Sequence, residues 1–130
     1  MGKRVKELQD YINKVKKDAI DELCRRLKCN QFIYCQLSVG VNKGCHNEGD
    51  WEDTIVMFGT FRSQLFIKRE CCWASFEHDY PAEVYLKLLD YLDEHEKDIE
   101  YVNDSKEQWH VCGEKTTTLY KYLEYCLYDR

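Results

Sequence analysis

A change of hydrophobic period near residue 30 is the sequence feature that most constrains the fold. Before it, apolar side chains recur every three or four residues, which predicts one long amphipathic helix over residues 3–28. The helix stripe consists of Val5, Leu8, Ile12, Val15, Ala19, Leu23 and Leu27. From residue 31 to 41 the pattern becomes alternation, with apolar side chains at the odd positions from Ile33 to Val41. This predicts a strand with one covered face, so helices and a sheet must share one core.

The middle of the chain predicts two more strands. Residues 54–61 and 64–73 are rich in β-branched and aromatic side chains, and Arg62 and Ser63 lie between them as the expected reversal. Together with the first strand they form a predicted three-stranded antiparallel meander. Residues 42–53 contain two glycines and several charges, which predicts a loop between the first two strands.

The last third of the chain predicts two further helices. Pro81 is suited to the first position of a helix, whose inner stripe comprises Val84, Tyr85, Leu88, Leu89 and Leu92. A short fourth strand is expected over residues 109–112, and Thr116 to Thr118 offer capping oxygens before a C-terminal helix. The predicted fold is α+β. It has a three- or four-stranded antiparallel sheet, one face of which is covered by a long N-terminal helix, a central acidic helix and a C-terminal helix.

The length of the chain predicts a single domain over residues 1–130. A chain of 130 residues is near the commonest domain size, and its one proline leaves no proline-rich linker to divide it. No apolar run approaches the roughly 20 residues that a membrane span needs, so no membrane partner is expected.

Eight cysteines in a chain with no recognisable secretion signal predict a reducing compartment, the cytoplasm, with free thiols. Cys35 lies on the apolar face of the first predicted strand and Cys126 on the apolar stripe of the last helix. Both are interpreted as small hydrophobic core residues.

Four other soft ligands suggest a metal site. Folding the meander places Cys45 and His46 at the same end of the sheet as Cys71 and Cys72, and one structural zinc ion is the cofactor that fits this set. Because neighbours in a strand point to opposite faces, one ligand must come from His78, His110 or Cys112 unless a bulge intervenes. The alternative is that these cysteines are free thiols.

The charge of the chain is unevenly distributed. The first 28 residues hold nine basic and five acidic side chains, so with an overall net charge of −5 the rest of the chain carries −9. Six acids concentrate within residues 90–100, where Lys97 is the one basic side chain. This acidic rim comprises Asp90, Asp93, Glu94, Glu96, Asp98 and Glu100.

The acidic rim has two interpretations. It is either a solubilising helix face or a surface that docks on a basic partner, since carboxylates along a helix can take the place of phosphates. Ten tyrosines, four of them in the last predicted helix, favour the second interpretation, because exposed tyrosine is enriched at binding surfaces. We therefore expect a binding protein that occludes the nucleic-acid-binding surface of a protein partner.

In its size, acidic rim and tyrosine content the chain resembles the small acidic inhibitors that phages and other mobile elements use against bacterial defence, anti-CRISPR proteins in particular. The resemblance implies a location in the host-cell cytoplasm, no catalysis, and a CRISPR effector nuclease as the partner. These families share no common fold or site, so no residue role is carried over to this chain.

A second hypothesis is a zinc-stabilised regulator that lays its basic N-terminal helix on nucleic acid. Lys3, Lys6, Lys14, Lys17 and Arg25 would contact phosphates. Five interleaved acids weaken the positive field of this helix, and the isoelectric point of the chain, near 5.4, is far below that of typical nucleic-acid-binding domains. Direct nucleic-acid binding is therefore ranked second. An enzyme is not expected, since the sequence contains no phosphate-binding loop, dinucleotide fingerprint, zinc-protease motif or nucleophile elbow.

Overall fold

The computed structural model describes residues 2–43, 50–70, 75–76, 80–102, 109–111 and 115–128. Over these residues it contains three helices, α1 (Lys3–Arg26), α2 (Ala82–His95) and α3 (Leu119–Tyr128). A five-stranded sheet has the order β4-β3-β2-β1-β5 and is antiparallel throughout. Its strands are β1 (Phe32–Lys43), β2 (Asp50–Phe61), β3 (Gln64–Arg69), β4 (Ser75–Phe76) and β5 (Tyr101–Val102). The predicted α+β class and central meander are confirmed.

The turn between β2 and β3 lies at the predicted residues. Arg62 and Ser63 both have positive φ, 50° and 68°. Two consecutive left-handed residues match the right-handed twist of a two-residue hairpin. The backbone N–H of Arg62 also donates to Oδ1 of Asn30 at 3.0 Å, which fixes the turn against the connection between α1 and β1.

The expected fourth strand forms, but outside the main sheet. Residues 109–111 are β6 (Trp109–Val111), which pairs with β7 (Lys115–Thr117) in a separate two-stranded sheet. The two-residue strands β4 and β5 extend the main sheet instead. They are too short for any hydrophobic period to reveal them.

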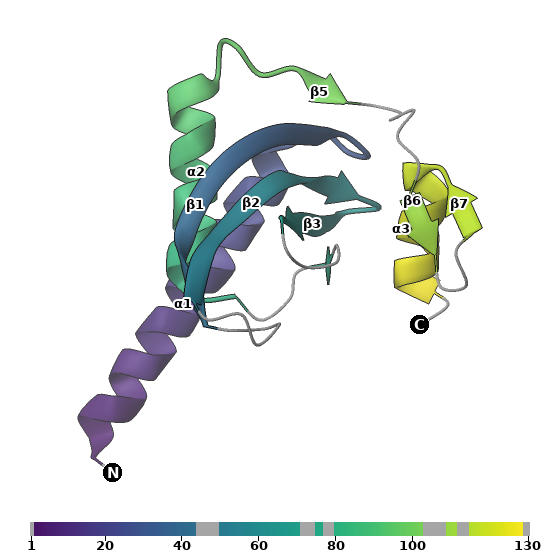
Figure 1. The fold of residues 1–130 in the computed structure, drawn as a ribbon. Coiled ribbons are helices and arrows are strands. Elements are labelled where there is room, and N and C mark those ends of the chain that lie inside the picture. The colour runs from purple at the N-terminus through teal and green to yellow at the C-terminus, as the bar shows by residue number, and fades with distance from the viewer. Residues whose placement is uncertain are drawn as a thin grey trace.

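Two helices cover one face of the sheet. Side chains of α1 and α2 pack together with Ile33, Cys35, Phe58 and Ile67 of the sheet in one buried cluster. The helices run in the same direction, since Nζ of Lys16 lies over the ring of Tyr85 and, further along both helices, Arg26 contacts Asp93. Figure 1 shows α1 and α2 side by side against the sheet.

The third helix lies on the opposite face, which differs from the predicted packing. Tyr122 and Leu123 of α3 are buried with Phe32, Met57 and Phe66. A bulge between Ile55 and Met57 turns Met57 to this side. The sheet is therefore covered on both faces, with α3 apart from the α1–α2 layer (Figure 1).

Only the C-terminal half of α1 contributes to the core. Its buried residues are Ala19, Ile20 and Leu23, whereas every side chain from residue 2 to 14 is exposed. Residues 3–14 of α1, here called the N-terminal arm, extend beyond the sheet (Figure 1). Over the described residues, no helix is long and apolar enough to cross a membrane.

Candidate functional site

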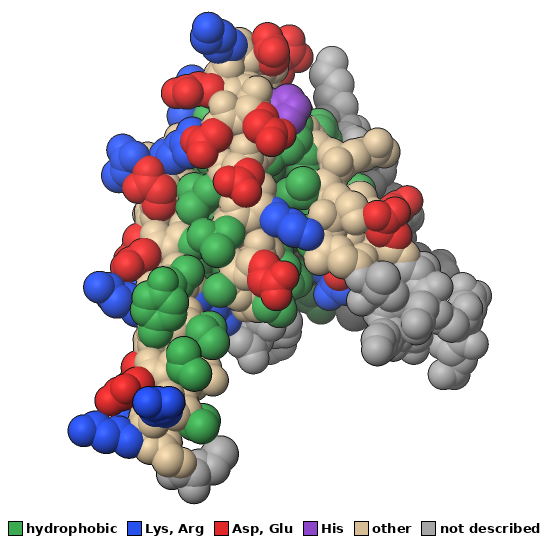
Figure 2. Space-filling view, turned by 90° about the vertical axis from the view of Figure 1, so that its left-hand side faces the viewer, with side chains coloured by type: hydrophobic (Ala, Val, Ile, Leu, Met, Phe, Trp, Pro, Cys, Tyr) green, Lys and Arg blue, Asp and Glu red, His purple; other side chains and the backbone are tan. Residues whose placement is uncertain are grey.

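All six side chains of the acidic rim are exposed. Asp90, Asp93 and Glu94 lie on the last two turns of α2, Glu96 is its C-cap, and Asp98 and Glu100 lie on the segment that leads to β5. In Figure 2 acidic side chains gather at the end of the molecule opposite the N-terminal arm, around the single histidine visible there. The rim is therefore one surface rather than a set of scattered charges.

One member of the rim is neutralised inside the molecule. Nη1 of Arg26, on α1, donates to Oδ1 of Asp93 at 2.7 Å. The Arg26 side chain is 22% exposed and that of Asp93 is 65% exposed. Asp93 thus joins α2 to α1 and is less available to a partner than the sequence suggested.

The other five carboxylates make no ion pair with any described residue. Their position does not stabilise α2 either, because the C-terminal end of a helix carries a partial negative charge. Each anion near that end costs the helix about 0.3–1 kcal/mol. The last turn of α2 contains His95 but no lysine or arginine that would offset this charge. A cluster that opposes the helix dipole and has no counter-ion among the described residues is suited to attract positive charge from outside.

A cavity of about 250 Å³ opens beside the rim. It lies between the end of α2, the segment that follows, and strand β1. Its lining consists of Ile33, Tyr34, Tyr91, His95, Asp98, Ile99 and Glu100. Two rim carboxylates therefore belong to the wall of a pocket.

The aromatic wall of this pocket is held rigid by the helix. The rings of Tyr91 and His95, one turn apart, stack with centroids 4.1 Å apart and an interplanar angle of 21°. Nδ1 of His95 lies 3.0 Å from the carbonyl oxygen of Tyr91, which assigns the proton to that nitrogen. Burial raises the pKa of the Tyr91 hydroxyl, with a smaller contribution from Cys35, so this side chain stays neutral.

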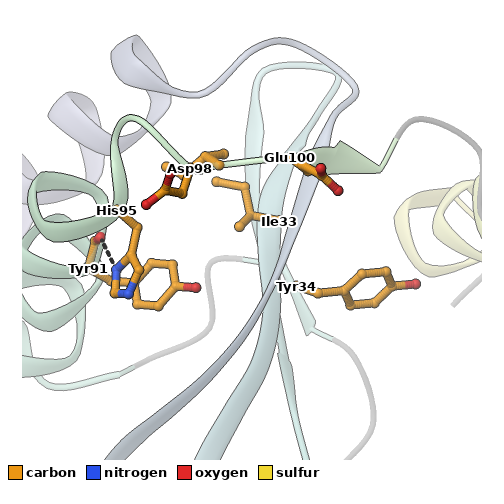
Figure 3. A pocket seen from close by; sticks show the side chains of 7 residues that line it. Ile33, Tyr34, Tyr91, His95, Asp98 and Glu100 are labelled. Atoms are coloured by element: carbon orange, nitrogen blue, oxygen red, sulfur yellow. Dashed lines mark hydrogen bonds between the residues drawn. The ribbon is translucent and has the colours of Figure 1, made fainter.

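Figure 3 shows how the polar groups are disposed. The carboxylate of Asp98 points toward the His95 ring, and Glu100 lies on the other side of Ile33. Tyr34 points away toward the opposite face of the sheet, as expected for the strand neighbour of the buried Ile33. Stacked rings beside carboxylates are what a lysine or arginine side chain binds, through cation–π contact and charge-assisted hydrogen bonds. The Tyr91–His95 pair was not predicted, although aromatic residues four apart on a helix are a signal for it.

The predicted metal ligands Cys45, His46, Cys71 and Cys72 lie outside the described residues, as do His78 and Cys112. Within the described part of the chain, no three His, Cys, Asp or Glu side chains are grouped closely enough to hold a metal ion. The zinc site stays a prediction.

The described cysteines are free thiols. Cys35 is 9% exposed, and its Sγ donates to the carbonyl oxygen of Ile55 at 3.4 Å. Burial raises the pKa of this thiol to about 12. The interpretation of Cys35 as a packing residue is confirmed, and the side chain of Cys126 lies outside the described set.

The described tyrosines of α3 are mainly packing residues, and the side chain of Tyr128 lies outside the described set. Tyr122 is buried, and Tyr120 and Tyr125 are half-buried against the same cluster. The hydroxyl of Tyr120 donates to the carbonyl oxygen of Asn30 at 2.9 Å, which anchors α3 to the α1–β1 connection. Among the residues whose side chains the structure describes, the exposed large aromatic ones are Tyr11 on α1 and Tyr34 on β1.

Comparisons of the chain with protein-family models, with curated proteins and with solved structures find no match.

Proposed function

We propose that this protein is a binding protein that docks its acidic rim on the basic nucleic-acid-binding surface of a partner protein and blocks that surface by occlusion. The observation that carries the proposal is the set of five exposed rim carboxylates, Asp90, Glu94, Glu96, Asp98 and Glu100, which have no ion pair among the described residues. Their placement at the negative end of α2 reduces helix stability, so helix stability does not account for it.

The pocket beside the rim supplies the specific part of this contact. A partner arginine entering it would stack on the Tyr91–His95 pair and form hydrogen bonds with Asp98. The surrounding carboxylates act at longer range, because a field of one sign accelerates the encounter with a surface of the opposite sign. Such a surface, built to hold phosphates, would accept carboxylates in their place.

The partner class that we propose is a protein that handles nucleic acid inside a host cell. The resemblance to anti-CRISPR inhibitors favours a CRISPR effector nuclease within that class. Occlusion requires no chemical step, so no catalytic residue is assigned. The nucleic-acid regulator remains the second hypothesis, since the basic residues of α1 that it would use are also exposed.

The test uses three forms of the full chain as bait in nuclease-treated lysate. The rim variant carries Glu94→Lys, Asp98→Lys and Glu100→Lys. The control carries Asp21→Lys, Glu70→Lys and Glu83→Lys, which change the net charge equally at exposed acids elsewhere. The wild type and the control should retain a protein that the rim variant loses, and added nucleic acid should release it by competing for the same surface.

Two results would reject the proposal. One is capture of the same proteins by the rim variant, which would make the rim a solubilising face. The other is retention of a partner together with its nucleic acid, which would exclude occlusion. Direct binding of DNA or RNA to the isolated chain, weakening steeply with salt, would instead support the regulator hypothesis.

A further inference from the structure

The N-terminal arm carries an apolar stripe that no described segment covers. Val5 is 49% exposed, Leu8 62%, Tyr11 66% and Ile12 47%. Figure 2 shows hydrophobic side chains along the arm, on the same face of the molecule as the acidic rim but at its other end. A contiguous apolar stripe on a projecting helix marks a place where another molecule binds.

The spacing of the stripe indicates what kind of molecule binds. Val5, Leu8, Ile12, Val15 and Ala19 follow each other at steps of three, four, three and four, the pattern of a coiled-coil seam. Beyond Ala19 the steps to Leu23 and Leu27 are both four, and there the helix packs on its own sheet and on α2. Apart from Tyr11, which lies beside the seam, the stripe occupies two positions per heptad. A stripe of this width fits one partner helix, whereas helices that lie on membranes present a broader apolar face.

The charge of the arm selects among partner helices. Between residues 3 and 14, four side chains are basic and two are acidic, which gives a net charge of +2. The first turn of α1 contains no acidic residue, so the positive end of the helix dipole is uncompensated as well. Two copies of this helix would repel each other in either orientation. An acidic helix is therefore the complementary occupant.

We propose that residues 4–16 of α1 bind an acidic amphipathic helix of another protein as a two-stranded coiled coil. Val5, Leu8, Ile12 and Val15 provide the seam, and Arg4, which flanks it, pairs with a partner carboxylate. At a rise of about 1.5 Å per residue the contact is about 18 Å long, so its affinity depends on both the seam and the flanking charges. This surface is separate from the acidic rim and opposite to it in charge.

The test measures binding of the full chain to a synthetic helical peptide of about three heptads, with leucine at the seam positions and glutamate at the flanking positions. We expect it to bind at least tenfold more tightly than the same peptide with lysine at the flanking positions. Leu8→Gln with Ile12→Gln should weaken glutamate-peptide binding at least tenfold. The matched control, Glu7→Gln with Asp10→Gln, changes the same two turns outside the seam and should bind at least as tightly as the wild type. All four side chains are exposed, so both variants should keep the wild-type thermal midpoint.

Every other outcome overturns the proposal. Equal binding of the glutamate and lysine peptides, binding of neither, or unchanged binding by Leu8→Gln with Ile12→Gln would each do so. Sedimentation of the wild type as a dimer that this variant dissociates would make a second copy the occupant. Binding to phosphatidylserine vesicles without binding to the glutamate peptide would show that the stripe binds a lipid surface instead of a helix.

Discussion

Cys35 shows how a single residue can be identified from the sequence and still acquire a property that the sequence does not reveal. Alternation along residues 31–41 was sufficient to place it on the apolar face of β1. The raised pKa depends on which elements cover that face, here α1 and α2, and these come from distant parts of the chain. Buried thiols of this kind couple the stability of the fold to alkaline pH.

The first prediction concerns this coupling. In the unfolded chain the thiol of Cys35 loses its proton near its ordinary pKa of 9.0, whereas in the folded protein it keeps the proton up to about pH 12. Alkali therefore favours the unfolded state, and stability falls between pH 9 and 12 by about 1.4 kcal/mol per pH unit. Cys35→Ser keeps a donor to Ile55 but does not ionise in this range. Between pH 8.5 and 10.5, urea unfolding should show the wild type losing about 2 kcal/mol more than the variant; parallel profiles would contradict the prediction.

The second prediction concerns Gly59, where β2 lies against the connection between α1 and β1. A Cβ at this position would lie 2.2 Å from the carbonyl oxygen of Gln31 and 2.7 Å from Cα of Phe32. These are backbone atoms that cannot move aside without breaking the pairing of Gly59 with Phe32. Gly59→Ala should lower the free energy of unfolding by about 2–3 kcal/mol in a denaturant titration. Gly2→Ala, where the new Cβ meets nothing within 4 Å, is the control, and equal stability of the two variants would be the contrary result.

At the scale of elements, hydrophobic period predicted which segments are helices and strands, but not which faces are covered. The helical stripe from Val5 to Leu27 is continuous in the sequence, yet only its second half packs on the protein. The reason is geometric: α1 has 24 residues and its neighbour α2 has 14, so the shorter helix cannot cover the longer one. Likewise, alternation in β1 predicted that one face of the strand is buried. The other face is buried as well at Phe32, because α3, which begins 87 positions later, covers it.

Two ion pairs between elements provide the third prediction, because their burial differs. Arg69 holds Asp53 across β2 and β3 with two contacts, of 2.9 and 2.6 Å, and the two side chains are 21% and 15% exposed. The Arg26–Asp93 pair between α1 and α2 has a single contact and a 65% exposed carboxylate. Asp53→Asn should lower the free energy of unfolding by about 1.5–2 kcal/mol, since a nearly buried guanidinium loses its counter-ion. Asp93→Asn should lower it by at most about 0.5 kcal/mol, because its carboxylate is exposed. Denaturant midpoints of the two variants decide the order, and the reverse ranking would show that burial does not govern these pairs.

At the scale of the whole molecule, the parallel course of α1 and α2 separates the two charged surfaces. The basic arm lies at the N-terminal end of the helical layer and the acidic rim at the other end (Figure 2). The sequence predicted the two charge runs but not this separation, because the separation depends on the relative direction of two helices that are distant in the chain. If both surfaces bind as proposed, a basic partner and an acidic partner would dock at opposite ends of the molecule.

The fourth prediction tests whether the N-terminal arm serves binding rather than folding. Residues 2–14 bury no side chain, so a chain that begins at Lys14 retains every described core residue. It should lose the helical circular-dichroism signal of Lys3–Asn13, 11 of the 24 residues of α1, while its thermal midpoint stays within a few degrees of the full chain. Leu23→Ala, a cavity-forming change in the buried half of the same helix, should instead cost about 3 kcal/mol. If the shortened chain were as destabilised as Leu23→Ala, the arm would be part of the folding unit, and its exposed stripe could no longer be explained by binding alone.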